Sequence, residues 1–250
     1  MTRHLLKSHA AMTDTKTGAK TDAKRIIIVD LLRHGEPEGG DILRGRINPK
    51  LTPTGWRQMS TSAALTLDPN AAYAAELGLI SPVSPTPLTP RWTKVISSPL
   101  ERCQHFAAHA AAAHTLTPHV EDRWQEIDYG DWDGMPIDEW RKIAAPQFAE
   151  FRRDLSKLAP PNGENYLDFK DRILGAWADI ATEPDGGHVL VVTHGGVLRV
   201  VLPTVLGMPL NKSFPLHIPF ASFSRVRLEV VGKKVSASVL FHNAAEYPSN

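Results

Sequence analysis

The sequence predicts an α/β fold whose sheet is parallel or mixed and has an antiparallel edge. Two short apolar runs rich in β-branched residues, 26–32 and 188–193, each lead into a histidine followed by glycine. Such runs are typical of strands that are buried on both faces in the middle of a sheet. Two further runs, 223–231 and 235–241, flank a Gly-Lys-Lys turn and predict an antiparallel hairpin at the sheet edge.

Composition limits the class of protein. The chain has 250 residues, 42% of them hydrophobic, which is enough for one α/β domain with a full core. Its formal net charge of +1 excludes the strongly basic signature of a nucleic-acid-binding protein. No apolar run approaches the roughly 18 residues of a membrane-spanning helix. The single Cys103 excludes an intramolecular disulfide, which fits a reducing compartment, so we expect a cytoplasmic protein without nucleic-acid or membrane partners.

Two stretches stand apart from the predicted domain, which covers residues 25–250. Residues 1–24 are polar, lack the apolar core of a signal peptide and predict a disordered tail, and Met12 is an alternative start of the natural chain. Residues 68–92 contain five prolines and no periodic pattern. We interpret them as a surface insertion that is either functional or mobile, and a short helix at about 71–77 is left open.

Helix signals mark much of the remaining chain. Thr52 followed by proline predicts an N-cap and a helix over 53–67. A capping box at Ser98, with proline next and glutamate three residues later, predicts a helix that continues to about His114. Further helices are expected over 136–158 with a break near Pro146, over 166–180 and over 197–206, and short strands at 93–97 and 119–121.

Candidate site residues follow the two buried strands. Arg33 and His34 come directly after the first strand, and His194 comes after the second. Ligands bind at the carboxyl ends of strands in open α/β sheets, so the two histidines are expected to face one crevice. Arg102 lies in the first turn of the helix that follows Ser98, where its guanidinium and free backbone N–H groups would meet an anion together. For each motif taken alone, a polar turn or a solvated arginine is the plain alternative.

The stretch 126–134 holds four carboxylates among aromatic residues and glycines. We interpret it as a structured loop that presents one acid to the crevice. His105 and His109 are four residues apart on a predicted helix, but a zinc site needs three or four ligands, so we expect no metal there. Cys103 is expected to pack in the core.

Together these motifs resemble the histidine phosphatase superfamily, also called phosphoglycerate-mutase-like. The matching stretches occur in that family's order: Leu-Arg-His-Gly-Glu at 32–36, Leu-Thr-Pro-Thr-Gly at 51–55, Ser-Ser-Pro-Leu-Glu-Arg at 97–102, Glu-Ile-Asp-Tyr-Gly-Asp-Trp-Asp-Gly at 126–134, Gly-Glu at 163–164 and Thr-His-Gly-Gly at 193–196. The resemblance implies a three-layer α/β/α sandwich with a mostly parallel mixed sheet and an antiparallel edge.

The same resemblance implies a phosphatase that hydrolyses a small phosphate monoester without a metal or other cofactor. It implies that His34 becomes phosphorylated and that Glu126 is the proton donor. Arg33, Arg102 and His194 would hold the phosphate. The chemistry agrees, because attack on a phosphate dianion needs a neutral imidazole and nearby cations lower the pKa of a histidine.

Two positions depart from the family's commonest pattern. Pro37 stands where the family often has Thr or Ser, and Gly40 stands where it often has Asn. Two polar contacts to the phosphate are thus missing, and Arg44 or Arg46 is a candidate to replace them. The spacing of the motifs most resembles that of bacterial α-ribazole phosphatases, which act in cobalamin nucleotide-loop assembly. We therefore expect α-ribazole 5'-phosphate as one candidate substrate.

Two other functions stay open. One is phosphoryl transfer of the phosphoglycerate mutase type, which requires a phosphoenzyme shielded from water and usually a Trp-Asn pair after the histidine motif, which this chain lacks. The other is a non-catalytic module that binds a phosphorylated ligand, which would need only the cationic clamps. The sequence also leaves the oligomeric state open, a homodimer included.

Overall fold

The structure is a computed structural model that describes residues 23–63, 67–68, 81–82 and 92–244. The expected tail therefore lies outside the described residues except for its last two positions, and so do Met12 and the short helix considered at 71–77. Most of the proline-rich stretch is outside them as well.

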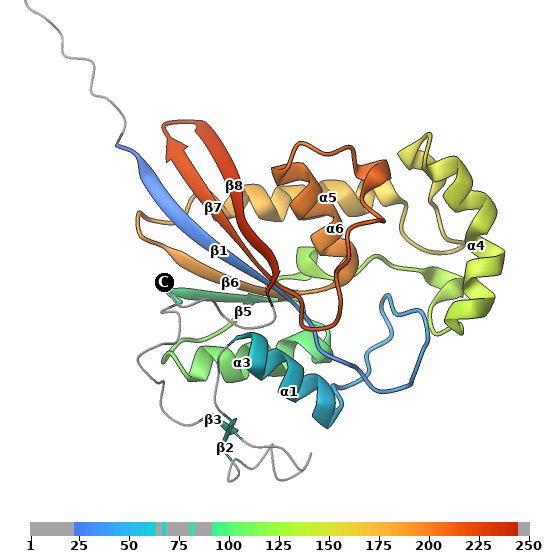
Figure 1. Ribbon diagram of the computed structural model, residues 1–250, viewed down its shortest axis with the longest axis horizontal. Helices are drawn as coiled ribbons and strands as arrows, with labels where there is room; N and C mark the ends of the chain where they lie inside the picture. The colour runs from blue at the N-terminus through green and yellow to red at the C-terminus, as the bar shows by residue number, and fades with distance from the viewer. Residues whose placement is uncertain (1–22, 64–66, 69–80, 83–91, 245–250) are drawn as a thin grey trace, which may run out of the picture.

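A six-stranded mixed sheet in the order β5-β4-β6-β1-β7-β8 forms the middle of the fold (Figure 1). Strands β5, β4, β6 and β1 run parallel, and β7 and β8 add an antiparallel edge. The bounds are Arg25–Arg33 for β1, Lys94–Ser97 for β4, His119–Val120 for β5, His188–Thr193 for β6, Phe223–Val231 for β7 and Lys234–Ala244 for β8. The predicted mostly parallel sheet with an antiparallel edge is confirmed.

Helices cover both faces of this sheet, which confirms the three-layer sandwich (Figure 1). Helices α1 and α3 lie on one face, α5 and α6 on the other, and α4 lies beyond the carboxyl ends of the parallel strands. Their bounds are Pro53–Ser62 for α1, Glu101–Ala112 for α3, Ile137–Phe151 for α4, Tyr166–Ile180 for α5 and Gly195–Val205 for α6. None of the described helices is long and apolar enough to cross a membrane. Single 3-10 turns occur at Asp122–Trp124, Gly130–Trp132, Leu155–Lys157 and Leu210–Lys212.

Strand β1 contributes to both hydrophobic cores, as its apolar run predicts. Val29 and Leu31 are fully buried in the core beneath α5 and α6. Leu32 is fully buried in the opposite core, with Trp56 of α1 and Phe106 of α3. Because successive side chains of a strand point to opposite faces, this alternation fixes the position of β1 between two helical layers.

Several helix boundaries differ from prediction. Helix α1 ends at Ser62 instead of continuing to 67, because Leu67–Asp68 (β2) pairs with Ser81–Pro82 (β3) as a short antiparallel ladder. Helix α4 is not broken at Pro146 but continues to Phe151, where it ends before the predicted boundary at 158, and Leu155–Lys157 forms a separate 3-10 turn. Proline has no backbone N–H, so the Lys142 carbonyl, four residues earlier, receives no hydrogen bond within the helix. Lys142 is exposed, and water can solvate this carbonyl.

The predicted capping box at Ser98 is wrong. Helix α3 begins at Glu101, whose backbone N–H donates to Asn48 Oδ1 at 2.7 Å, so a residue from a distant loop caps the helix. The Ser98 hydroxyl accepts the backbone N–H of Leu100 at 3.3 Å, before the helix begins, and it also lies 2.7 Å from Nε2 of His194. Arg102 still lies in the first turn, as expected.

A buried charge cluster joins β1, β6 and β7 in the middle of the sheet. Asp30 of β1 is fully buried and accepts hydrogen bonds from Arg225 of β7 at 2.7 Å and from Trp92 at 2.9 Å, and Nε2 of His188 lies 2.8 Å away. Burial alone would raise the pKa of Asp30, but the hydrogen bonds and charges of His188 and Arg225 outweigh it and lower this pKa.

We predict that Asp30→Asn lowers the free energy of unfolding by about 3 kcal/mol, because it removes the buried negative charge that accepts two hydrogen bonds from Arg225. The folded pKa of Asp30 lies below its ordinary value of 3.8, so its contribution is present above that pH and is lost as the pH falls through the lowered value. Urea unfolding of both proteins between pH 3 and 7 measures the difference. The exposed Glu150→Gln is the control, and an equal loss in both variants would contradict the prediction.

Candidate active site

A cleft of about 600 Å³ opens at the carboxyl ends of the parallel strands. Five charged or titratable side chains of its lining concern the chemistry: Arg33, His34, Arg44, Glu126 and Arg199. The sheet pairing explains why two histidines meet here. β1 and β6 are adjacent and parallel, so the residues that follow them emerge side by side.

His34 is held in one orientation. Its backbone N–H donates to the carbonyl of Thr193 at 2.9 Å, and its ring lies 5.3 Å from the ring of His194, centroid to centroid. Nδ1 lies 2.8 Å from the Gly35 carbonyl. Because a carbonyl can only accept, this contact assigns the proton to Nδ1 and leaves the lone pair on Nε2 free.

The surroundings of His34 keep it neutral. Burial lowers the pKa of His34 well below its ordinary value of 6.5, and the positive charges of Arg102 and Arg33 lower it further. His194 has a pKa lowered in the same way, by burial first and then by Arg102. Both imidazoles are therefore uncharged near pH 7.

The two predicted arginines are both anchored to backbone carbonyls. Arg33 donates from Nη1 to Ile218 at 2.6 Å and stacks over the Phe220 ring at 4.4 Å. Burial lowers the pKa of Arg33 to about 10, with nearby Glu126 acting in the opposite direction, so it stays charged near pH 7. Arg102 is fully buried and donates to the carbonyls of residues 45 and 47 at 2.8 and 2.7 Å.

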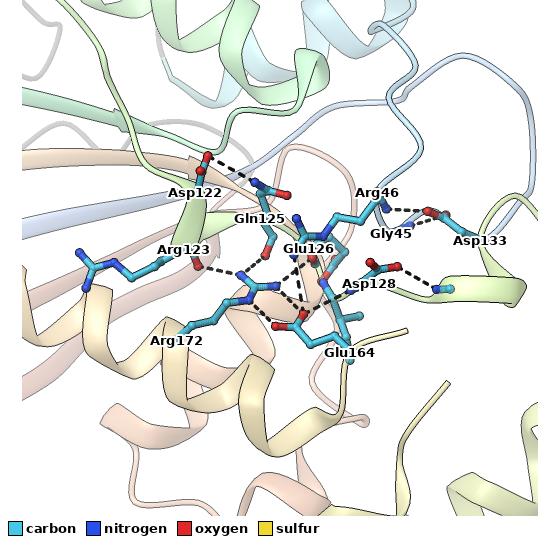
Figure 2. A network of polar contacts seen from close by, with 12 residues as sticks. Gly45, Arg46, Asp122, Arg123, Gln125, Glu126, Asp128, Asp133, Glu164 and Arg172 are labelled. Carbon is cyan, nitrogen blue, oxygen red and sulfur yellow. Dashed lines mark hydrogen bonds and ion pairs between the residues drawn. The ribbon is translucent and has the colours of Figure 1, made fainter. Parts of the chain in front are cut away.

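The loop that receives Arg102 is fixed by Asp133. The Asp133 carboxylate accepts the backbone N–H groups of Gly45 and Arg46 at 2.7 and 2.6 Å (Figure 2). It also accepts the backbone N–H of Ile47 at 2.8 Å. The carbonyls of two of these residues, Gly45 and Ile47, accept hydrogen bonds from the Arg102 guanidinium. The chain of contacts thus runs from Asp133 through the loop to Arg102, whose charge acts on His34.

Glu126 is the one of the four carboxylates in 126–134 that lines the cleft. Its Oε2 accepts the backbone N–H of Gly196 at 2.9 Å, and its Oε1 accepts that of Ile127 at 3.1 Å. A Cβ on Gly196 would lie 2.1 Å from Glu126 Oε1, so only glycine allows this approach. The other three carboxylates stabilise loops: Asp128 accepts from the Gly130 N–H, Asp131 from Asn162, and Asp133 from residues 45–47.

An ion pair positions the backbone around Glu126. Arg172 of α5 forms a two-point contact with Glu164, at 2.6 and 2.8 Å (Figure 2). The same guanidinium donates to the carbonyls of Arg123, Gln125 and Glu126 at 2.8, 2.8 and 3.0 Å. Helix α5 therefore holds the start of the acidic loop in place.

The predicted site residues do not all reach the cleft surface. Arg102 and His194 are fully buried behind it, and Ser98 hydrogen-bonds the His194 ring. Arg44 lines the cleft, but its guanidinium donates to the carbonyls of residues 38, 40 and 42 and braces that loop. Arg46 lies 3.9 Å from Glu164, at the edge of the ion pair with Arg172.

Two residues for which the sequence predicted no catalytic or metal-binding role pack inside the fold: Cys103 is buried in the core, and His109 is partly buried. Cys103 is fully buried, which confirms that it packs, and burial raises its thiol pKa to about 12. His109 packs against Trp56 and Phe106 with ring centroids 5.5 and 5.7 Å apart, and burial lowers its pKa to about 4. Among the residues that the structure describes, no group of three His, Cys, Asp or Glu side chains is placed to hold a metal ion.

Sequence reasoning missed Arg199. It lies four residues after Gly195 on α6, which places it over the same face of the helix, and its side chain lines the cleft. The sequence predicts that this helix begins at Val197. It begins at Gly195, directly after His194, so Arg199 lies one turn farther along on the same face as Gly195. A correct helix start would therefore have indicated Arg199 as a residue of the cleft.

The fold and the cleft define a class of protein, an α/β sandwich with a cleft that contains arginines, carboxylates and a buried neutral histidine at the carboxyl edge of its parallel strands. Residues 88–239 match the model of the histidine phosphatase superfamily (branch 1). The chain belongs to this family, which confirms what the motifs predicted. The match contains Arg102, Glu126 and His194, and Arg33 and His34 precede it.

Proteins with related sequences align with different fractions of this chain. "Bifunctional protein Rv2228c" of Mycobacterium tuberculosis is 31% identical over 210 residues, covering 83% of this chain and 51% of the relative. This chain thus spans about half the length of that relative. "Adenosylcobalamin/alpha-ribazole phosphatase" of Escherichia coli is 26% identical over 165 residues, covering 60% of this chain and 81% of the relative. The solved alpha-ribazole phosphatase from Shigella flexneri shares the fold, with a TM-score of 0.66 at 22% identity over 89% of this chain and 99% of that one.

We predict that Asp133→Ala raises the pKa of His34 from its lowered value toward 6.5. Without its carboxylate acceptor the 45–47 loop loosens, Arg102 moves, and one of the charges that lower this pKa acts less strongly. Titration of the His34 ring by NMR measures the change. Asp131→Ala, in the same loop but bonded to Asn162, is the control. A His34 pKa that is the same in both variants would contradict the account.

Proposed function

We propose that the protein is a phosphomonoesterase that hydrolyses a small phosphate monoester through a phosphohistidine intermediate on His34. The observation that carries this proposal is the buried, neutral His34 with a free Nε2 beside guanidinium groups that have no carboxylate partner. In the described part of the chain, no carboxylate oxygen lies within 4 Å of Arg33 or Arg102. An anionic ligand would supply the missing negative charge.

In the first step, the Nε2 lone pair attacks the phosphorus in line with the ester oxygen. The new P–N bond forms while the P–O bond to the alcohol breaks. Arg33 and Arg102 stabilise the charge on the transferring oxygens, and each has a buried Nε without a hydrogen-bond partner among the described residues. Glu126, in its protonated form, gives a proton to the leaving oxygen.

In the second step, water attacks the same phosphorus and the P–N bond breaks. The Glu126 carboxylate takes a proton from this water, and the electron pair returns to Nε2. Free phosphate and the starting enzyme result. The arginines supply fixed positive charge in both steps, so this scheme uses no metal ion or other cofactor.

The proposed substrate class is small phosphate monoesters, and α-ribazole 5'-phosphate is one candidate. Support for that candidate comes from the Escherichia coli relative, which is named adenosylcobalamin/alpha-ribazole phosphatase. A relative in Yersinia pestis is named probable phosphoglycerate mutase, 30% identical over 54% of this chain, so phosphoryl transfer is the second function to test.

A panel of phosphate esters tests the proposal. We expect p-nitrophenyl phosphate and at least one natural monoester to release phosphate in the presence of a chelator, and His34→Ala to lose roughly 10³-fold or more in kcat. The panel contains α-ribazole 5'-phosphate, and each ester is tried with and without a 2,3-bisphosphoglycerate primer. Interconversion of phosphoglycerates that depends on primer would indicate a mutase, and binding of esters without turnover would indicate a non-catalytic module.

We further predict that the effect of Glu126→Gln depends on the leaving group. An alkoxide leaves poorly unless it is protonated, so kcat for an alkyl or sugar phosphate should fall roughly 10² to 10⁴-fold. The phenolate of p-nitrophenyl phosphate needs little protonation, and the loss with this ester should be far smaller. Asp128→Asn, which alters only a turn, is the matched control. An equal loss with both esters would mean that Glu126 positions the phosphate and is not the acid.

A further inference from the structure

A second hollow, of about 890 Å³, lies between helix α4 and the segment 211–215. We refer to it as the α4 hollow. Its volume is within the range of roughly 300 to 1,000 Å³ that is usual for small-molecule sites. His34 and the other residues of the proposed chemistry do not line it, so the α4 hollow has no role in that chemistry.

One face of α4 forms the first wall of the α4 hollow. Arg141, Ala145, Phe148 and Arg152 line it and are three or four residues apart, so they share one side of the helix. Ala145 is exposed in the middle of this face. Its small side chain leaves room for a ligand between the larger side chains on either side.

The second wall is attached to the first at two points. The Asn211 side-chain amide donates to the backbone carbonyl of Arg152 at 2.7 Å, and the Phe214 ring packs edge-on against the Phe148 ring with centroids 5.0 Å apart. The two walls therefore keep a fixed spacing. The α4 hollow is formed by connected elements before any ligand arrives.

Aromatic rings separate the α4 hollow from the catalytic cleft. Tyr129 lines the cleft and packs against Trp140 at 6.1 Å, and Trp140 packs against Phe148 at 5.4 Å. Phe214 lines both spaces and is 43% exposed. The apolar part of the α4 hollow is therefore aromatic and suits a flat ring, which can pack against Phe148 and Phe214.

The charges that line the α4 hollow are all positive. Arg141, Arg152 and Lys212 line it, and no carboxylate does. Arg141 is paired with Asp138 at 3.3 Å. In the part of the chain that the structure describes, no carboxylate oxygen lies within 4 Å of the side-chain nitrogens of Arg152 or Lys212. The complementary ligand therefore carries negative charge.

We infer that the α4 hollow binds a small molecule that joins a flat aromatic ring to an anionic group, a sulfonate, carboxylate or phosphate. The ring packs against Phe148 and Phe214, and the anionic group pairs with Arg152 and Lys212. This site is additional to the catalytic cleft. The inference does not depend on the proposed function, because none of its residues takes part in the proposed chemistry.

Two dyes that differ in charge test the inference. 8-Anilinonaphthalene-1-sulfonate carries a sulfonate, and N-phenyl-1-naphthylamine has the same rings without it. Fluorescence titration of the full chain measures the dissociation constant of each dye. We expect the double variant Arg152→Gln/Lys212→Gln to weaken binding of the sulfonate dye roughly tenfold and to change binding of the uncharged dye by less than about twofold. Both substituted residues are exposed, so the variant should fold normally.

A matched double variant controls for net charge. Lys142→Gln/Arg153→Gln removes the same charge from exposed positions that do not line the α4 hollow. We expect it to leave the dissociation constants of both dyes as in the wild-type protein.

Filling the α4 hollow tests the location of the site. Ala145→Trp places an indole in the space that the alanine leaves open, and we expect it to weaken binding of both dyes at least roughly tenfold. Ile143→Trp adds the same ring at an exposed position of α4 outside the α4 hollow, and it should leave binding unchanged.

Four results would overturn the inference. The first is a wild-type protein that does not bind the sulfonate dye. The second is binding of this dye that the Arg152/Lys212 variant leaves unchanged, which decides the question even if Ala145→Trp does not fold. The third is an equal loss in the Lys142/Arg153 control, which would indicate a general effect of charge. The fourth is a wild-type dimer, measured by light scattering, that Ala145→Trp converts to a monomer, since a second copy of the chain would then occupy the α4 hollow.

Discussion

The placement of a neutral imidazole among buried guanidinium groups is the constraint on which the rest of the site depends. Two like-charged arginines near a histidine would be strongly unfavourable if the histidine were also charged, so the protein keeps His34 neutral by burial and by the same arginines. The guanidinium groups themselves are stabilised by backbone carbonyls, which supply partial negative charge without neutralising them. Their net charge therefore remains available to a ligand.

The sheet topology makes this arrangement possible with few residues. Adjacent parallel strands end at the same edge, so His34 and His194 meet without any long-range adjustment of loops. Glycines allow the remaining close contacts. Gly196 admits the Glu126 carboxylate, and Gly195 leaves space for the side chains of Arg33 and Arg199. A side chain at Gly196 would displace the Glu126 carboxylate, which the proposed chemistry requires, whereas a side chain at Gly195 would require the neighbouring arginines to shift by a few tenths of an ångström.

Local sequence signals predicted the strands and the strand-end histidines, because buried strands have a strong compositional pattern. The layer arrangement was implied by the resemblance to the family. Contacts between distant segments were not predictable in this way. The capping of α3 by Asn48, the bonding of Ser98 to His194 and the loop-fixing role of Asp133 each join residues that are far apart in the chain. The family motifs indicated Glu126 as the acid. Four carboxylates lie within eight residues of sequence, so only the structure could show that Glu126 lines the cleft and that the three aspartates do not.

The most direct test of this account is the chemical identity of the phosphoenzyme. After a rapid quench that avoids acid, peptide mapping and ³¹P NMR should find phosphate on His34, bonded to Nε2, because Nδ1 donates to the Gly35 carbonyl and has no free lone pair. The His34→Ala protein should retain no phosphate under the same conditions. Phosphate on Nδ1 of His34, on His194 or on any residue of the His34→Ala protein would contradict the account.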